Sequence, residues 1–197
     1  MLVAMSSPSR KLATVDDLLA LGEDTKSELI DGEILPKALP GEPHQHAETT
    51  LTRWLGRRFD RAASASWPGG WFIRHEVHCV YAREQVFCHD LAGWRRDRLE
   101  LGARGWVHIS PDWVCEVLSD GHKRRDRLNK PRVLHEHAVP HYWLIDFEEK
   151  LLEIYRYAPS GYALVNTVTT GEVVRLEPFT EVELRTSVIF GDEDDEA

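Results

Sequence analysis

The amino-acid sequence predicts a single α/β domain with the order helix, sheet, crossover helix, sheet. Apolar residues recur at helical spacing between about 43 and 62, whereas residues 114–118 form a short run that is apolar apart from one glutamate and is typical of a central strand. Neither an internal repeat nor a linker interrupts the 197 residues, a length that suits one domain with a substantial core. We expect residues 13–190 to form this domain, residues 1–12 a flexible arm and residues 191–197 an acidic tail.

Turn and capping residues predict the first part of the domain. Thr14 and Asp17 resemble a capping box at the start of a short helix that Gly22 would end. Residues 27–34 are typical of two short strands around an Asp-Gly turn. The sequence Trp-Pro-Gly-Gly at 67–70 then interrupts the chain after the long helix.

The second part alternates strands with one further helix. That helix is expected from near 129 to 138, and it should start late because proline, present here as Pro131, is best tolerated in a first helical turn. The expected strands are 71–81, 86–91, 112–118, 142–145, 151–157, 162–169, 173–176 and 182–184.

Composition and charge limit the classes of function. Hydrophobic residues make up 42% of the chain and no run approaches the roughly 18 apolar residues of a membrane span, so we expect no membrane partner. The three cysteines leave at least one unpaired, which favours a reducing compartment, and we expect a cytoplasmic location. The net charge of −9 argues against binding duplex nucleic acid by bulk charge, although a local basic patch would still contact phosphates.

Glu116 is the leading candidate for a functional residue. It lies in the middle of the expected central strand, where a lone carboxylate is costly to bury unless it is protonated, paired or bound to a metal. Side chains alternate along a strand, so Asp112, Val114 and Leu118 share its face. The alternative is a structural acid paired with one arginine.

Two more acids and a basic segment extend this candidate site. Asp90, on a neighbouring strand, would be the second carboxylate of a Mg²⁺ site, although most aspartates at strand ends cap turns. Glu28, on an early strand, would join the site or be an exposed edge residue. One lysine of segment 123–132 would neutralise the site and orient an attacking water, while the other cations of the segment are expected on a solvated helix face.

Histidine and cysteine chemistry has weaker support. Two histidines and two cysteines, which are residue types that bind zinc, occur on a predicted hairpin at His78, Cys79, Cys88 and His89. Adjacent strand residues point to opposite faces, so these four side chains do not converge in regular pairing. The helical spacing of His44 and His46 points them apart, and we interpret both as ordinary residues.

Several blocks occur in an order that resembles a known family. The blocks are residues 28–34 (ELIDGEI), a helix with His44 ahead of spaced leucines, 89–99 (HDLAGWRRDRL), 111–119 (PDWVCEVLS), 126–130 (DRLNK) and 139–146 (VPHYWLID). Over roughly residues 14–190 this order closely resembles the Uma2 family of the PD-(D/E)XK nuclease superfamily. The resemblance implies a restriction-endonuclease-like fold, a central mixed sheet flanked by helices, and a Mg²⁺-dependent nuclease site, with Mn²⁺ as a substitute ion.

The resemblance also implies roles for individual residues. Asp90 matches the acid of the "PD" element and Glu116 that of the "E-x-K" element, and these two would hold the metal. Lys130 stands in for the lysine, which in this family is moved from the strand to the next helix. Glu28 matches an early family acid.

The chain departs from the motif at three positions. His89 replaces the usual proline, which we expect to have no effect because that proline is not a ligand. Leu118 occupies the usual lysine position, and Pro131, directly after Lys130, would alter the reach of that lysine. Lys123 is the alternative site lysine.

Three functions follow from these residues. The first is a metal-dependent endonuclease that acts on DNA, with the Val117 carbonyl joining Asp90 and Glu116 around Mg²⁺. The second is a catalytically inactive nucleic-acid-binding or interaction module that keeps the nuclease fold, favoured by Leu118 and the net charge of −9. The third is a structural zinc protein. Exposed edge strands and a short basic surface suggest a homodimer.

Overall fold

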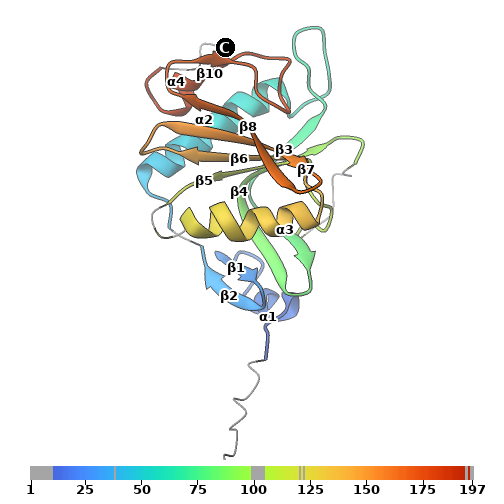
Figure 1. Cartoon of the computed structure of the whole chain (residues 1–197). Coiled ribbons are helices and arrows are strands. Elements are labelled where there is room, and N and C mark those ends of the chain that lie inside the picture. The colour runs from blue at the N-terminus through green and yellow to red at the C-terminus, as the bar shows by residue number, and fades with distance from the viewer. Residues whose placement is uncertain are drawn as a thin grey trace, which may run out of the picture.

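The centre of the molecule is an eight-stranded mixed sheet with the order β2-β1-β4-β5-β6-β7-β8, and β3 pairs with β4 beside this path. The structure, a computed structural model, describes residues 11–37, 39–98, 105–119, 121, 123–193 and 195. Figure 1 shows α3 in front of the sheet and α2 behind it. This arrangement confirms the predicted α/β domain. Most of the predicted arm, residues 1–12, lies outside the described residues.

The first elements form as the turn and capping residues predict. They are α1 (Val15–Leu19), β1 (Ser27–Ile30), β2 (Glu33–Pro36), α2 (Glu42–Arg58), β3 (Trp71–Ala82) and β4 (Gln85–Arg95). Thr14 and Asp17 make the reciprocal hydrogen bonds of a capping box. Asp31 and Gly32 both have positive φ, 49° and 73°, which is the backbone that a two-residue turn between β1 and β2 requires.

The later elements differ from prediction at the crossover helix. They are β5 (Trp113–Val117), the π-helical turn η1 (Arg125–Asn129), α3 (Lys130–Glu136), β6 (His141–Asp146), β7 (Leu151–Ala158), β8 (Gly161–Thr169), β9 (Val173–Val174), β10 (Leu184–Arg185) and α4 (Thr186–Ile189). Pro131 lies in the first turn of α3, as predicted, but η1 extends the helical segment toward the N-terminus. The four residues of α4 are too few to show a helical period, and no helix is predicted there.

Strand β4 connects the two halves of the sheet. It pairs with β3 along most of its length, with β1 at Val86 and with β5 over residues 91–93. Gly93 lies at that crowded crossing, where a Cβ would lie 3.0 Å from Ile73 and 3.2 Å from Trp113 and these neighbours would have to shift by a few tenths of an ångström. Strands β5 and β6 form the parallel pair, and the η1–α3 segment is the connection between them.

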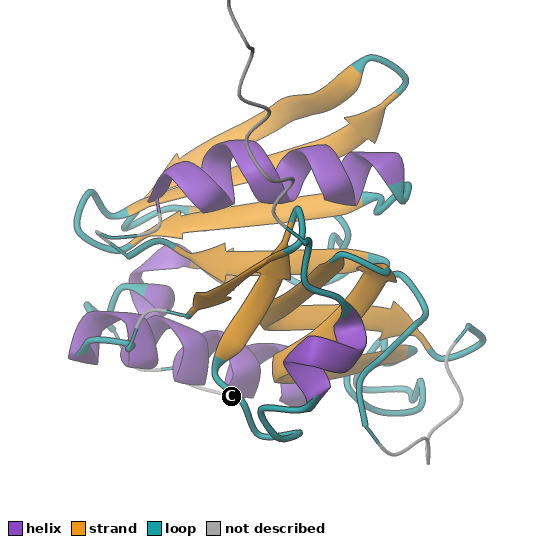
Figure 2. Ribbon diagram, turned by 90° about the horizontal axis from the view of Figure 1, so that it is seen from below, coloured by secondary structure: helices purple, strands orange, loops and turns teal. Residues whose placement is uncertain are grey.

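Alternating side chains of β5 supply both cores. Trp113, Cys115 and Val117 belong to the core under α2, whereas Val114 and Leu118, which directly follows the strand, belong to the core under α3. Figure 2 shows long helices on both sides of the central strands. Glu116 therefore lies on the α3 side of the sheet, as its alternation with Val114 and Leu118 predicts.

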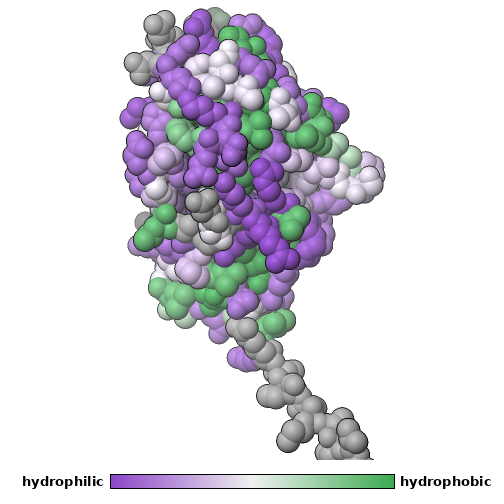
Figure 3. Space-filling model, turned by 60° about the vertical axis from the view of Figure 1, so that its left-hand side comes forward, coloured by the Kyte–Doolittle hydropathy of each residue, from purple (hydrophilic) through white to green (hydrophobic). Residues whose placement is uncertain are grey.

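The surface and the C-terminal region complete the description. Hydrophilic side chains separate the apolar areas on the face drawn in Figure 3. Asp192 lies 2.5 Å from Lys150, and Asp195 lies 2.9 Å from Arg58, so these two acids of the predicted tail contact the domain. Among the described residues, none of the helices has the length and apolar character needed to cross a membrane.

Candidate functional site

The four predicted site residues lie together around one cavity of the sheet. Glu28 comes from β1, Asp90 from β4, Glu116 from β5 and Lys130 from the start of α3, and each is at most 2% exposed. All four line one cavity of about 20 Å³. The pairing of β1, β4 and β5 and the crossover helix thus bring together residues that are far apart in the sequence.

Lys130 is the cation at the centre of this cluster. Its Nζ lies 2.9 Å from Glu116 Oε2, 3.2 Å from Glu28 Oε1 and 3.1 Å from Asp126 Oδ1. Burial alone would lower the pKa of Lys130, but the three carboxylates outweigh it and raise this pKa well above its usual value. An ammonium group has three N–H donors, so the three carboxylates match its full hydrogen-bonding capacity.

The alternative lysine lies elsewhere. Lys123 Nζ is 3.5 Å from Asp146, the last residue of β6, and 3.1 Å from Glu148, which follows the strand. The π-helical turn before α3 places Asp126 one turn ahead of Lys130, so both side chains point to the sheet despite Pro131. Leu118 is 7% exposed and packs in the apolar core under α3. The helix therefore supplies the site lysine that the strand lacks.

His89 fixes the other oxygen of Glu116. Its Nδ1 lies 2.5 Å from Glu116 Oε1, and its Nε2 lies 2.7 Å from the Tyr81 hydroxyl. Burial and the charge of Lys130 hold the pKa of His89 well below its usual range. A neutral ring that donates from Nδ1 to the Glu116 carboxylate accepts from the Tyr81 hydroxyl at Nε2. The sequence did not predict this contact of His89 with a site carboxylate, and the expectation that its replacement of proline has no effect stays a prediction.

Asp90 contacts three groups from other elements. The backbone N–H of Val117 donates to Oδ2 at 2.7 Å, and His44 Nε2 lies 3.2 Å from the same oxygen. Lys37 Nζ lies 2.7 Å from Oδ1. Burial raises the pKa of Asp90, but Lys37 and His44 outweigh it and hold this pKa well below its usual range. Asp90 is therefore ionised.

Two of these partners correct or extend the sequence interpretation. His44 is not an ordinary helical residue, because it contacts Asp90 from the first turn of α2. Its position ahead of the spaced leucines of the helix was the available signal. Lys37 follows β2 and precedes the helix, and no spacing in the sequence points to it. Only the β1–β2 hairpin, packed against β4, brings it to Asp90.

Glu28 is buried, so the alternative of an exposed edge residue is wrong. Strand β1 lies between β2 and β4, and the Cys88 backbone N–H donates to Glu28 Oε1 at 3.1 Å. Arg125 NH1 donates to Glu28 Oε2 at 2.9 Å, so this arginine belongs to the site and not to a solvated helix face. Burial raises the pKa of Glu28, and Lys130 and Arg125 reverse that shift and lower it.

Burial has its strongest effect on the pKa of the two remaining acids, Glu116 and Asp126. Burial, with Asp90 adding to it, raises the pKa of Glu116 to about 7 although Lys130 opposes the shift. Burial raises the pKa of Asp126 to about 6, again against Lys130. The site therefore holds four carboxylates against the cations of Lys37, Lys130 and Arg125, and a proton on Glu116 or Asp126 would bring the cluster closer to neutrality.

The donor set fits a hard divalent cation in chemistry. Asp90 and Glu116 supply carboxylate oxygens, which Mg²⁺ and Mn²⁺ prefer. Asp90 Oδ1 is buried and has no hydrogen bond of good geometry, only its ion pair with Lys37. As the described side chains stand, however, no three His, Cys, Asp or Glu residues converge as metal ligands. In this structure Asp90 and Glu116 instead have lysines, histidine rings and the Val117 backbone N–H as their partners.

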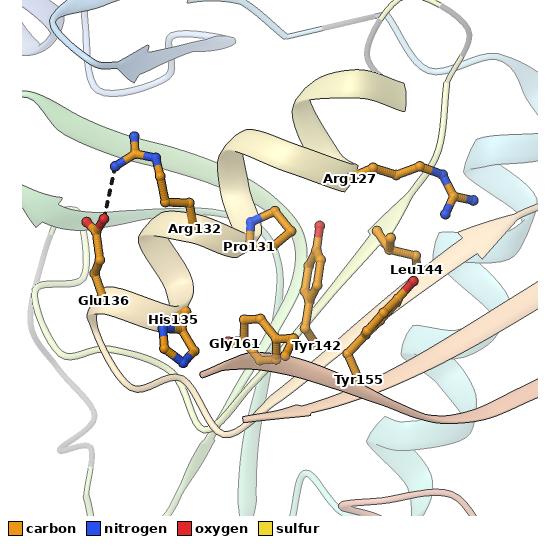
Figure 4. A pocket seen from close by; sticks show the side chains of 10 residues that line it. Arg127, Pro131, Arg132, His135, Glu136, Tyr142, Leu144, Tyr155 and Gly161 are labelled. Atoms are coloured by element: carbon orange, nitrogen blue, oxygen red, sulfur yellow. Dashed lines mark hydrogen bonds and ion pairs between the residues drawn. The ribbon is translucent and has the colours of Figure 1, made fainter. Parts of the chain in front are cut away.

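A second, larger pocket lies on the other side of the η1–α3 segment. Its volume is about 450 Å³, and Figure 4 shows the rings of Tyr142 and Tyr155 below the helix and the side chain of Arg127 at one end. The Tyr142 hydroxyl donates to the backbone carbonyl of Asp126 at 2.8 Å. This pocket thus touches the backbone of the segment that carries the charged cluster.

Comparison with known proteins relates the whole domain to one family. The model of the Uma2 family, described as "Putative restriction endonuclease", matches residues 13–188. A solved structure from Anabaena variabilis ATCC 29413, titled as a putative nuclease belonging to DUF820, superposes with a TM-score of 0.71 at 21% sequence identity. The match covers 90% of this chain and 97% of that one. No curated protein shows significant similarity to the chain.

Proposed function

Because the chain belongs to the Uma2 family and has the restriction-endonuclease-like fold, we propose that it is a Mg²⁺-dependent endonuclease that hydrolyses phosphodiester bonds of DNA. The family and the fold support a nuclease, and the metal and the DNA substrate are the further parts of the proposal. The observation that carries the proposal is the burial of Asp90 and Glu116 beside each other, at 2% and 1% exposure, with Lys130 2.9 Å from Glu116.

Asp90, Glu116 and the Val117 carbonyl are the groups that would hold the metal. When bound, a divalent ion supplies positive charge for the scissile phosphate and lowers the pKa of a water molecule. Lys130 and His89 fix one oxygen each of Glu116, and the Val117 N–H orients Asp90. Side chains held on both sides in this way keep ligands in position before the reaction.

Lys130 and Arg125 are the cations available to the substrate. Lys130 orients an attacking water once it releases one of its three carboxylates, and Glu28 then keeps the ammonium in place. Arg125 has a side chain that is 14% exposed at the edge of the cavity, and its guanidinium suits contact with a phosphate oxygen. Glu28 assists by holding both cations.

A test needs variants that change charge and preserve shape. Purified protein with Mg²⁺ or Mn²⁺ should cut plasmid, single-stranded or branched DNA, and Glu116→Gln and Asp90→Asn should each abolish cleavage. Asp112→Asn is a matched control, because Asp112 accepts a hydrogen bond from the Arg95 backbone N–H and lies outside the cavity lining. Equal cleavage by wild type and Glu116→Gln would refute the proposal.

The second candidate is a nucleic-acid-binding or interaction module without turnover. A specific observation favours it: both metal-ligand candidates already have protein partners, around a cavity of only about 20 Å³. This candidate predicts that DNA is bound but never cut at any metal concentration. Binding of labelled DNA without cleavage, equal in wild type and Glu116→Gln, would support it.

A further inference from the structure

Lys37 is paired with a site acid and stands at the boundary of two cavities. Its ammonium lies 2.7 Å from Asp90 Oδ1, and its side chain is 10% exposed. On one side it lines the site cavity of about 20 Å³, and on the other it lines a cavity of about 290 Å³ with Lys26, Glu48 and Glu76. The smaller cavity holds about one water molecule, so it has no room for a hydrated ion while Lys37 is in place.

A second carboxylate lies within reach of the same ammonium. Glu76 Oε1 is 3.5 Å from Lys37 Nζ and belongs to the wall of the larger cavity. In the pairing of β3 with β4, His75 faces Leu91 and Val77 faces His89, so Glu76 stands opposite Asp90. Glu76 has φ of 46°, in the left-handed region that glutamate rarely adopts within a strand. This local backbone distortion occurs at the register position of the metal-ligand candidate.

From this geometry we propose that Lys37 is an internal competitor of the metal ion, held on Asp90 in the metal-free protein and transferred to Glu76 when a divalent cation binds. The inference rests on the proposed function and adds a residue that sets metal affinity. A cation on Asp90 leaves no net charge there for Mg²⁺, whereas Lys37 on Glu76 restores a bare carboxylate oxygen. The larger cavity supplies the space into which the ammonium moves.

The direct test is binding of Mn²⁺ alone, followed by the electron paramagnetic resonance signal of the free ion. If Lys37 occupies Asp90 in at least nine-tenths of the molecules, Lys37→Met should tighten Mn²⁺ binding by about tenfold or more, because the apparent dissociation constant scales inversely with the competent fraction. Glu76→Gln should weaken Mn²⁺ binding several-fold, because the lysine loses its second partner. Both changes are expected without DNA present.

Lys26→Met is the matched control. Lys26 pairs with the same Glu76, but its side chain is 62% exposed and it does not line the site cavity. Its replacement should leave Mn²⁺ affinity within about twofold of wild type if only the pairing with Asp90 matters. Circular dichroism and urea unfolding of each variant verify that the measured protein is folded.

The outcomes separate this inference from the proposed function. If wild type and Lys37→Met bind Mn²⁺ with equal affinity and Asp90→Asn binds none, the competitor role is overturned. The proposed metal site then still stands. Weaker binding by Lys37→Met would also overturn it, since Lys37 would then assist the metal. No Mn²⁺ binding by any folded variant would overturn both proposals.

Discussion

The two faces of the η1–α3 segment use similar residue types in opposite ways. Lys130 and Arg132 both pair with carboxylates, but the side chain of Lys130 is 3% exposed and that of Arg132 is 48% exposed. The inward face closes around a cavity of about 20 Å³, whereas the outward face borders a tyrosine-lined pocket of about 450 Å³. Burial, and not residue type, therefore separates the charged cluster from a surface ion pair.

This difference shows why one helix is able to serve two surroundings. Outward, Arg132 pairs with Glu136 at 3.0 Å and Asp31 at 2.8 Å, and water screens both contacts. Inward, each charge depends on its neighbours, because the protein interior screens poorly. A substitution of a charged residue on the inward face should therefore affect the interactions of several residues, whereas a substitution on the outward face should affect only one or two.

The largest expected effect is the loss of the inward cation. Lys130→Met leaves the three carboxylates around it without their shared partner, and we expect a loss of about 3–5 kcal/mol in the free energy of unfolding. Arg132→Met should cost at most about 1 kcal/mol, as exposed pairs do. Urea unfolding of both variants measures the contrast. Similar costs for the two would show that burial does not distinguish these faces.

The next effect is a change in pH dependence. Burial raises the pKa of Asp126 from 3.8 to about 6, so the folded state binds this proton more tightly than the unfolded state. Asp126 therefore contributes to stability at low pH, and this contribution, on the order of 1–3 kcal/mol, is lost as pH rises from the unfolded pKa to above the folded pKa. Asp126→Asn removes this titration. The unfolding free energy of wild type should therefore fall relative to that of the variant as pH rises from about 4 to about 7.

The Asp126→Asn measurement also has an outcome that would contradict the raised pKa of Asp126. A difference that stays constant across the same pH range would mean that Asp126 has an ordinary pKa in the folded protein. Arg132, which pairs with Glu136 on the outward face, provides the comparison, because Arg132→Met should leave the pH dependence of wild type unchanged.

The smallest effect tests the contact between the two faces. Tyr142→Phe removes the hydroxyl that donates to the Asp126 carbonyl at 2.8 Å, and a buried carbonyl left unpaired costs about 1–2 kcal/mol. Tyr155 lines the same pocket but is partly exposed, so Tyr155→Phe should change stability by less than about 0.5 kcal/mol. Thermal unfolding compares the two. Equal effects would show that the pocket does not support the inward face.

Most of the fold was predictable because its signals are local. The Asp31-Gly32 turn and the capping box at Thr14 depend on neighbouring residues, and the β5 run is apolar on both faces. Glu28, Asp90, Glu116 and Lys130 were also predicted as a set, and the structure brings them together, although their roles stay a prediction. An acid inside a strand is costly enough to be conspicuous in a sequence.

The partners of these acids were not predictable in the same way. Lys37 lies 53 residues from Asp90, and Arg125 lies 97 residues from Glu28. Such contacts depend on how β1–β2 and η1 pack, which no local pattern specifies. The contact of His89 with Glu116 was not predicted, because comparison with a motif considers ligands and not the groups that contact them. The π-helical turn explains why Pro131 does not displace Lys130.

The dispersion of the cluster along the chain also has a kinetic consequence. Residues 28, 90, 116 and 130 meet only after β1, β4, β5 and α3 have all docked, so contacts of high sequence separation must form before the charges are neutralised. Closing such long loops is slow and belongs late in folding. An intermediate that lacks the β1–β2 hairpin would carry Asp90 without Lys37 and Lys130 without Glu28. The charged cluster should therefore form only in the last refolding phase, after most helical signal has recovered.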